Sequence, residues 1–452
     1  MKTALLIVFG ATGNLMYKKL LPALSNLLAE GHLPSRTQII CVGRRELDTP
    51  TYIENAKKET SSHLDWEPLK GKLTYFRMDF ETTSDYQRLK EAIADHDHDK
   101  ETMVYLAVPP RLFPVIAEGL HTVNLLSKGQ QETRIVFEKP FGEDLESARQ
   151  INQALWTYFD ESQLYRIDHY LGKDMIQNIM IVRFANQLFE SSWHHEAIAS
   201  ITIMAKERES VLNRAGYYDG IGAMKDMLQS HLFQMASLIL MEPPQANHAD
   251  AIRDEKVRVM QRMTLDPASL CVGQYRDYRQ APHVPAQSET ETFVYVKGYV
   301  DTPRWRNVPI HFVTGKHLDE KRSEIIIDFK TDTKRLFQTD HNKLHIKVAP
   351  EEGVSIQFNV KRPGLQETIT PAVLDYCHSC QAVGNTPEAY EKLILDLYKR
   401  QSGLFARWDE IETAWQLIEP LRQANKPLIF YDTYEELKDI IINHAKERLD
   451  DL

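Results

Sequence analysis

The chain has 452 residues, of which 42% are hydrophobic and 26% are charged, as in globular proteins large enough for two domains. Its formal net charge of −10 excludes a general basic surface for nucleic acid, so an anion site must be a local cluster. The sequence has no run of 18 apolar residues, and its first apolar run continues into a glycine turn instead of a cleavage site. We therefore predict a cytoplasmic protein that binds neither nucleic acid nor membrane.

The first 165 residues alternate between strand-like apolar runs and helix-compatible segments. The strand-like runs are 3–10, 38–47, 73–80, 103–110 and 133–140. Runs that are apolar throughout are typical of parallel strands buried on both faces. The alternation predicts a doubly wound parallel sheet of the Rossmann type.

A short glycine turn links the first strand to the first helix. Gly10 and Gly13 stand at the carboxyl end of that strand, where doubly wound sheets bind their ligands. A backbone without side chains can approach a pyrophosphate there, and the helix N-terminus favours its charge. This spacing also occurs in plain turns, but its position favours a dinucleotide site.

Two arginines, Arg44 and Arg45, follow the second strand. NAD sites usually carry an acidic residue there, whereas an arginine accommodates the 2′-phosphate of NADP. Guanidinium groups can bind a phosphate bidentately. The alternative is that the two arginines are solvent-exposed and neutralise the negative charges of Glu46 and Asp48. We predict NADP as cofactor, with NAD as a weaker alternative.

The cysteines and a histidine-rich turn give little sign of metal chemistry. Four cysteines (Cys41, Cys271, Cys377 and Cys380) are too few for a disulfide framework. The motif "CHSC" at 377–380 resembles a redox pair or half of a zinc site, but no second pair exists, so we interpret it as a strand end running into a loop. The segment 94–101 is interpreted as a solvated turn, and no metal site is predicted.

After residue 175 the pattern changes. Helical patterns at 175–189 and 220–241 flank a strand-like run at 197–207. Alternating runs then follow without intervening helices, at 291–300, 308–315, 323–330, 343–350 and 353–361. Such a succession predicts an α+β domain with a large, mainly antiparallel sheet. We expect a NADP-binding domain at 1–168 and a substrate-binding and dimerisation domain at 169–452.

The stretch "YRIDHYLGKDM" at 165–175 gathers polar chemistry around one glycine. His169, Tyr170 and Lys173 offer an imidazole, a phenol and an ammonium group. If a helix begins here, His169 and Lys173 share a face, and the helix start favours an anion. Gly172 leaves room for backbone approach. Both a phosphate cradle and a surface ion-pair cluster fit these residues.

His231 lies beside an apolar stripe in the predicted helix 220–241. A buried core histidine is the plain interpretation. The alternative is a general base, which oxidation of an alcohol requires and which an acid such as Asp168 or Asp226 would orient.

Eight motifs resemble the glucose-6-phosphate dehydrogenase family in their order and spacing, from residue 1 to about residue 425. They are "EKPFG" (138–142), "RIDHYLGK" (166–173), "RAGYYD" (214–219), "KDMLQSH" (225–231), "SETETF" (288–293), "RWRNVPI" (304–310), "TGKHL" (314–318) and "PEAYEKLILD" (387–396). The resemblance implies hydride transfer from C1 of glucose 6-phosphate to NADP, yielding 6-phosphogluconolactone and NADPH in the oxidative pentose phosphate pathway. It also implies a homodimer or homotetramer.

The resemblance implies a role for each matching residue. His231 is the general base for the C1 hydroxyl, Asp168 pairs with it, and Lys139 touches substrate and cofactor before a proline that the family holds in cis. The implied substrate contacts are Lys139, His169, Tyr170, Lys173, Glu207, Asp226, Lys316 and Lys321. The expected cofactor contacts are Gly10, Thr12, Gly13, Asn14, Leu15, Arg44, Arg45, Pro109 and Lys139. Of the two arginines, Arg44 alone has a family counterpart.

Several positions depart from the family pattern. Asn14 replaces an aspartate, Tyr17 stands where a basic residue is common, Ser230 replaces an asparagine, and Thr302 and Val313 replace an asparagine and an arginine. The C-terminal "AGSWGP"-like motif is absent. No catalytic group is lost, so the chain resembles a divergent member. The alternatives are a dehydrogenase for a related hexose 6-phosphate and a non-catalytic sugar-phosphate or NADP-binding regulator.

Overall fold

The computed structural model describes residues 3–60, 63–94, 100–211, 215–331, 337, 339–378, 380, 388–424 and 426–445. The chain divides into two compact units. Unit 1 comprises Met1–Gly172, His248–Arg253 and Pro387–Glu412, and unit 2 comprises Lys173–Asn247, Asp254–Thr386 and Thr413–Leu452. The predicted domain boundary at residue 168 stays a prediction. Most of the turn predicted at 94–101 lies outside the described residues, as does the C-terminal end 446–452.

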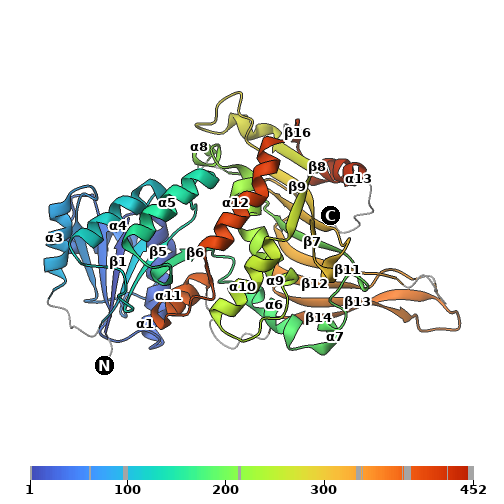
Figure 1. Ribbon diagram of the computed structural model, residues 1–452, viewed down its shortest axis with the longest axis horizontal. Coiled ribbons are helices and arrows are strands. Elements are labelled where there is room, and N and C mark those ends of the chain that lie inside the picture. The colour runs from blue at the N-terminus through green and yellow to red at the C-terminus, as the bar shows by residue number, and fades with distance from the viewer. Residues whose placement is uncertain are drawn as a thin grey trace. The chain divides into compact units, whose positions relative to one another are not determined.

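Unit 1 is built on a seven-stranded sheet (Figure 1). The strands are β1 (Thr3–Phe9), β2 (Gln38–Gly43), β3 (Leu73–Arg77), β4 (Lys100–Leu106), β5 (Thr133–Phe137), β6 (Leu164–Ile167) and β15 (Phe405–Ala406). Their order is β15-β6-β5-β4-β1-β2-β3. β1 to β6 pair in parallel, and β15 joins β6 antiparallel. The predicted doubly wound parallel sheet is confirmed, with β1 at the point where the strand order reverses.

Helices cover both faces of this sheet because successive side chains of a buried strand point to opposite faces. Ala4, Leu6 and Val8 of β1 belong to one apolar cluster with α1, α2 and α11. Leu5 and Ile7 belong to the other, with α3, α4 and α5. The helices of unit 1 are η1 (Met16–Leu20), α1 (Leu21–Ala29), α2 (Thr49–Glu59), α3 (Thr83–Ala92), η2 (Pro110–Leu112), α4 (Phe113–Thr122), α5 (Leu145–Tyr158), η3 (Glu161–Gln163) and α11 (Ala389–Lys399).

Unit 2 is built on a nine-stranded sheet ordered β14-β13-β12-β11-β7-β10-β9-β8-β16. The strands are β7 (Ile198–Lys206), β8 (Met263–Tyr275), β9 (Phe293–Val300), β10 (Ile310–Gly315), β11 (Arg322–Phe329), β12 (Lys343–Ala349), β13 (Gly353–Lys361), β14 (Ile369–Cys377) and β16 (Leu428–Tyr431). The predicted, mainly antiparallel sheet is confirmed, with parallel pairing of β7 with β10 and β8 with β16. The sequence pattern missed β8, whose register shifts between Asp266 and Cys271.

Helices of unit 2 differ from the predicted ones in their bounds and winding. They are α6 (Asp174–Phe184), α7 (Gln187–Glu190), α8 (Ala215–Tyr218), η5 (Met224–Leu232), α9 (Phe233–Leu240), η6 (Arg276–Gln280), η7 (Pro303–Trp305) and α13 (Tyr434–Ala445). The division between the units falls within α10 (Ala249–Met260) and α12 (Trp408–Gln423). The helix predicted at 220–241 begins at Met224 and is π-helical up to Leu232. Among the described residues, no helix is both long and apolar enough to span a membrane.

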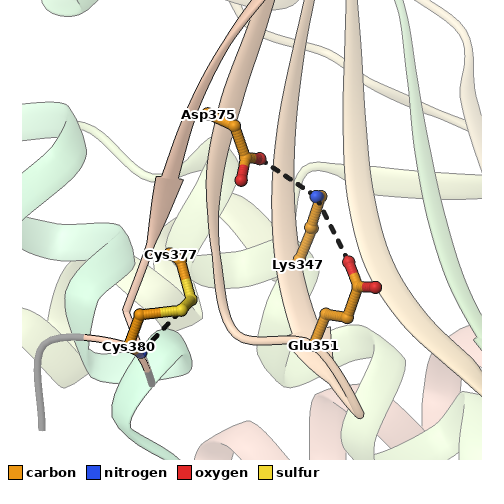
Figure 2. Close-up of a disulfide and its surroundings, with 5 residues drawn as sticks. All are labelled: Lys347, Glu351, Asp375, Cys377 and Cys380. Atoms are coloured by element: carbon orange, nitrogen blue, oxygen red, sulfur yellow. Dashed lines mark hydrogen bonds and ion pairs between the residues drawn. A yellow bond between two sulfur atoms is a disulfide. The ribbon is translucent and has the colours of Figure 1, made fainter.

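The CxxC motif ends the edge strand β14 (Figure 2). The prediction of a strand end is confirmed. Cys377 and Cys380 also form a disulfide, so the motif is a cysteine pair, the alternative that the sequence analysis set aside. Beside it, the Lys347 ammonium donates to Asp375 at 3.0 Å and to Glu351 at 3.3 Å. The spacing of two residues allows this bond, but only the bend of the chain after β14 brings the sulfurs together.

A buried ion cluster joins α11 to the parallel sheet of unit 1. The Glu101 carboxylate on β4 accepts from Arg134 on β5 and bidentately from Arg400, at 2.7 and 3.1 Å. Arg134 also donates to the carbonyl groups of Leu397 and Tyr398 at the end of α11. Glu101 and Arg134 are 7% and 2% exposed, so neither charge is compensated by water.

We predict that Glu101→Gln lowers the free energy of unfolding by about 3–5 kcal/mol, because the buried Arg134 and the exposed Arg400 lose the anion that they share. Thermal unfolding of the full chain measures this. The control is Glu67→Gln, which breaks an exposed pair with Lys70 and should change stability by less than about 1 kcal/mol. Equal effects of the two changes would contradict the structural role of Glu101.

Candidate active site

The glycine turn of unit 1 follows β1 at the carboxyl edge of the sheet. Gly10 has a φ of +84°, and a Cβ there would collide with the backbone carbonyl of Ala107. The Gly10 and Ala11 N–H groups donate to the Val42 carbonyl at 3.0 Å, and the Gly13 N–H donates to Gly10 at 3.0 Å. The turn is therefore fixed by its own backbone hydrogen bonds and presents main chain at the switch point of the sheet.

The other predicted cofactor residues lie around the same edge of unit 1. Asn14 and Pro109 are exposed, and Thr12 and Leu15 are half-buried. Pro109 follows β4, which is the neighbour of β1. The sheet thus brings these residues to the carboxyl ends of adjacent strands, as the sequence predicted for a dinucleotide site.

Arg44 and Arg45 are both exposed after β2 but differ in their surroundings. Arg44 lies over the Phe80 ring at 6.0 Å and lines a hollow of about 300 Å³ with Arg77, Met78, Asp79, Asp85 and Arg88. Arg45 instead lies near Tyr17, where it partly offsets the burial that raises the pKa of this phenol. The hollow beside Arg44 gathers guanidinium groups suited to a phosphate.

Lys139 follows β5 beside a buried carboxylate. The Lys139–Pro140 peptide bond is cis, as the resemblance implies. Glu138 accepts from the hydroxyl groups of Tyr105 at 2.5 Å and Tyr390 at 3.2 Å. Burial raises the pKa of Glu138, although these hydroxyls and Lys139 act in the opposite direction. Tyr390 on α11 therefore holds the segment that carries Lys139.

Residues 168–172 form a turn, so the condition under which His169 and Lys173 would share a helical face is not met. The Asp168 carboxylate accepts from the Tyr170 N–H at 2.9 Å, and the Asp168 carbonyl accepts from the Leu171 N–H at 3.0 Å. An aspartate side chain that binds the backbone in this way competes with helix formation. Helix α6 begins at Asp174, and Lys173 is its extended N-cap. His169 and Lys173 consequently do not share a helical face.

Asp168 and Tyr170 are buried, and His169 is half-buried. Gly172 meets a neighbour at close range, because a Cβ there would lie 2.9 Å from the carbonyl oxygen of Ala389. Within unit 1 the space beside Gly172 is therefore taken by the first residue of α11, and the approach of a phosphate to Gly172 stays a prediction.

In unit 2, three predicted substrate residues form one ion cluster. Lys316, after β10, contacts the Glu207 carboxylate directly and lies 3.5 Å from Asp226. Its ammonium group also lies over the Tyr218 ring at 5.1 Å. Burial alone would lower the pKa of Lys316, but Asp226 and Glu207 outweigh it and raise the pKa. The cluster keeps a charged ammonium group between two carboxylates.

Asp226 and His231 belong to the π-helix η5. A π-helix pairs residues five apart, and π-helical turns are frequent at functional sites. Asp226 and His231 are five apart, so π-helical winding points their side chains in more similar directions than α-helical winding would. His231 is 1% exposed. The sequence predicted both residues but not the winding that relates them.

Glu291 is a site residue that sequence reasoning missed. Its side chain accepts from the Met224 N–H at 2.9 Å, at the start of η5, and its backbone carbonyl accepts from the Ala223 N–H at 2.9 Å. Burial raises the pKa of Glu291, and the Met224 hydrogen bond only partly opposes this. Its place inside the "SETETF" motif was the available signal, but no local pattern indicates that it caps a helix 67 residues away.

Lys173 and Lys321 are not part of the Lys316 cluster. Lys173 precedes α6, where its carbonyl accepts from Ile176 and Gln177. Lys321 is exposed and lines a different hollow of about 490 Å³ over β11 and β12. The roles of these two lysines stay predictions.

Comparison with known proteins identifies the family. A family model described as the NAD binding domain of glucose-6-phosphate dehydrogenase matches residues 7–178, and the model of its C-terminal domain matches residues 180–436. The chain belongs to the glucose-6-phosphate dehydrogenase family. The resemblance seen in the sequence is thereby confirmed.

Individual glucose-6-phosphate dehydrogenases align along most of the chain. That of Chlamydia pneumoniae is 36% identical over 454 residues, which cover 92% of this chain and 88% of the relative. That of Bacillus subtilis (strain 168) is 35% identical over 456 residues, covering 94% and 93%. A solved glucose-6-phosphate dehydrogenase in complex with its substrate glucose-6-phosphate has a TM-score of 0.91 at 31% identity, covering 99% of this chain and 98% of that one. The enzyme from Mycobacterium avium has a TM-score of 0.85 at 31% identity, covering 95% and 94%.

Three of the departures from the glucose-6-phosphate dehydrogenase family pattern have local explanations, and nothing in the structure explains Asn14 or Thr302. Tyr17 is 5% exposed and packs against Tyr52, so a basic residue would be buried at this position. Val313 lies in the apolar core of unit 2. The Ser230 hydroxyl donates to the Asp226 carbonyl at 3.0 Å and thus stays within the π-helix.

We predict that the stability of the wild type relative to Glu291→Gln falls as pH rises above about 4.3, the ordinary pKa of a glutamate. A raised folded pKa means that the native state favours neutral Glu291; this contribution is complete below the unfolded pKa and is lost as pH rises through the folded value. Glutamine is neutral throughout and retains an oxygen for the Met224 N–H. Chemical denaturation between pH 4 and 8 measures the difference. Glu289→Gln, an exposed neighbour, is the control, and a parallel response of the two variants would contradict the prediction.

Proposed function

We propose that this protein oxidises glucose 6-phosphate at C1, with NADP as hydride acceptor, to 6-phosphogluconolactone. The observation that carries the proposal is the π-helix η5, which bears a buried histidine one turn from a carboxylate in the Lys316 cluster. Such an arrangement combines a base with groups able to hold sugar hydroxyls. Relatives that are 36% identical are named glucose-6-phosphate 1-dehydrogenase, and a similar solved enzyme is described in complex with that sugar phosphate.

In this proposal His231 takes the proton of the C1 hydroxyl group while the hydride leaves C1. Burial keeps bulk water from competing for the imidazole. Glu207 and Asp226 accept hydrogen bonds from other sugar hydroxyls, and Lys316 holds the two carboxylates in place by its ion pairs with them. Asp168, which binds the backbone of its own turn, is proposed from the family resemblance as the acid that stabilises the imidazolium.

The cofactor proposal rests on two features of unit 1. Bare backbone at Gly10 and Gly13 suits a pyrophosphate. Arg44 shares its hollow with Arg77, Arg88, Asp79 and Asp85, and Arg77 and Arg88 already pair with Glu46 and Asp85. We therefore propose Arg44 for the additional phosphate of NADP, because a guanidinium group binds phosphate more strongly than a hydroxyl. When bound, NADP supplies the carbon that accepts the hydride. Lys139 is proposed to contact both cofactor and substrate.

For the sugar phosphate group we propose His169, Tyr170 and Lys173. These residues offer an imidazole, a phenol and an ammonium group within five positions, and charge-assisted hydrogen bonds to such donors hold a phosphate. The turn made by Asp168 fixes the backbone of this segment. We also propose that the protein acts in the oxidative pentose phosphate pathway. In this proposal it is a homodimer or homotetramer in the cytoplasm.

Formation of NADPH, followed at 340 nm, tests the function directly. Glucose 6-phosphate should be the best substrate among several hexose 6-phosphates, and unphosphorylated glucose should be poor. Preference for another hexose 6-phosphate would replace the substrate assignment. No turnover with any of them, together with tight binding of NADP and sugar phosphate, would favour the non-catalytic regulator.

We predict that His231→Asn lowers kcat by roughly 10⁴-fold while the KM for the sugar phosphate changes by less than about tenfold. Loss of a general base typically costs ~10²–10⁴, and negative charge on the C1 oxygen places this case at the upper end. Steady-state kinetics measures both constants. His194→Asn, a partly exposed histidine of the same unit, should be nearly silent. A change confined to KM would assign His231 to binding alone.

We predict that Arg44→Ala raises the KM for NADP on the order of ten- to a hundredfold and leaves NAD kinetics nearly unchanged, because only the 2′-phosphate loses a partner. The preference for NADP should also shrink as salt rises. Arg45→Ala is the matched control and should have a smaller effect, since this side chain lies near Tyr17. Equal damage to NAD and NADP use in Arg44→Ala would show that Arg44 only supports the turn.

A further inference from the structure

A second hollow in unit 1, of about 400 Å³, is rich in arginines. It is lined by Gln131, Thr133, Arg134, Glu161, Ser162, Gln163, Leu164, Tyr165, Asp250, Arg253, Arg400, Ser402 and Arg407. Thr133 and Leu164 begin the parallel strands β5 and β6, whereas the glycine turn follows the carboxyl end of β1. This arginine hollow therefore lies at the opposite edge of the sheet from the predicted cofactor site.

Positive charge is in excess at the floor of the arginine hollow. Arg134 and Arg400 share the single carboxylate of Glu101. Burial and the neighbouring Arg400 lower the pKa of Arg134 to about 10, although Tyr165 opposes this. Two guanidinium groups around one carboxylate leave one cationic charge uncompensated. Arg400 is 38% exposed, but Arg134 is buried, so an additional anion beside Arg134 would neutralise charge in a poorly solvated place.

The acidic lining residues do not supply that anion. Glu161 is bound bidentately by Arg166 at 2.6 and 3.0 Å and also accepts from Trp156 at 2.9 Å and the Trp408 N–H at 3.0 Å. Its oxygens are thus already engaged. Asp250 is 69% exposed and pairs with Arg253 within α10 at 2.6 Å.

Donors remain available in the arginine hollow. The Nε atoms of Arg134 and Arg253 are buried and have no hydrogen-bond partner among the described residues. The side chains of these two arginines are 2% and 11% exposed. Arg253 also donates to Ser402 at 2.7 Å. A buried N–H without a partner costs free energy, and an anion in the hollow would satisfy it.

We propose that the arginine hollow is a second anion site that binds the phosphate group of a small metabolite. Guanidinium groups and hydroxyls match the several oxygens of a phosphate, and a volume of about 400 Å³ is within the range of small-molecule sites. Such a ligand would join β5, β6, α10 and the chain after α11, and its binding would stabilise unit 1. The proposal is independent of the reaction proposed above.

The test is thermal unfolding and isothermal titration calorimetry of the full chain with inorganic phosphate at constant ionic strength. Phosphate should raise Tm in the wild type. It should do the same in an Arg44→Ala, Lys173→Ala double variant, which lacks the predicted anion contacts elsewhere. An effect lost in this double variant, or no binding to the wild type, would overturn the proposal.

Arg253→Gln should bind phosphate at least tenfold more weakly, because it removes a charged donor while a polar side chain of similar reach remains. Arg407→Gln should also weaken binding and serves as a second variant if Arg253→Gln is unstable. The matched control is Arg258→Gln, whose pair with Glu255 has the same spacing on the same helix. Unchanged phosphate affinity in both Arg253→Gln and Arg407→Gln would overturn the site. Citrate in place of phosphate tests the ligand class, and tighter binding of citrate would overturn the phosphate assignment.

Discussion

The buried carboxylate of Glu101 fixes how the distant parts of unit 1 come together. It binds Arg134 on the neighbouring strand and Arg400, which is 299 residues away in the sequence. Arg134 also donates to carbonyl groups at the end of α11, and Arg400 is the C-cap residue of that helix. The ion cluster therefore holds α11 against the sheet. At its other end, α11 contacts Gly172 through Ala389 and Glu138 through Tyr390. The segments that carry Lys139 and Asp168 are therefore held in place by α11, a helix that begins more than 200 residues later in the sequence, at Ala389.

The two units contain ion clusters of opposite net charge. In unit 2, Lys316 lies between two carboxylates, and the excess negative charge raises its pKa. In unit 1, Glu101 lies between two guanidinium groups, so one positive charge is in excess and attracts an anion. Such clusters are costly to break once formed but are weak evidence for net stability, so what they position or bind explains their presence better than net stability does.

The sequence predicted most of the architecture because the architecture depends on local patterns. Continuous apolar runs identified five parallel strands, and alternating runs identified the antiparallel sheet, since each pattern follows from which faces are buried. It failed where one side chain overrides the pattern. Asp168 binds the Tyr170 N–H and forms a turn, so that helix α6 begins only at Asp174, and β8 contains Asp266 and Pro267, which conceal a strand.

The sequence by itself determined the family, the two sheet types and the identity of the polar residues, because motifs and periodicity are properties of the chain alone. It even placed Asp226 and His231 on one helix. Only the tertiary structure decided that this helix is π-wound, that Glu291 caps it, and that Lys316 lies against Glu207 and Asp226. The reason is physical: winding, burial and ion pairing depend on which distant groups compete for the same donors and acceptors. Local sequence specifies those groups but not their neighbours.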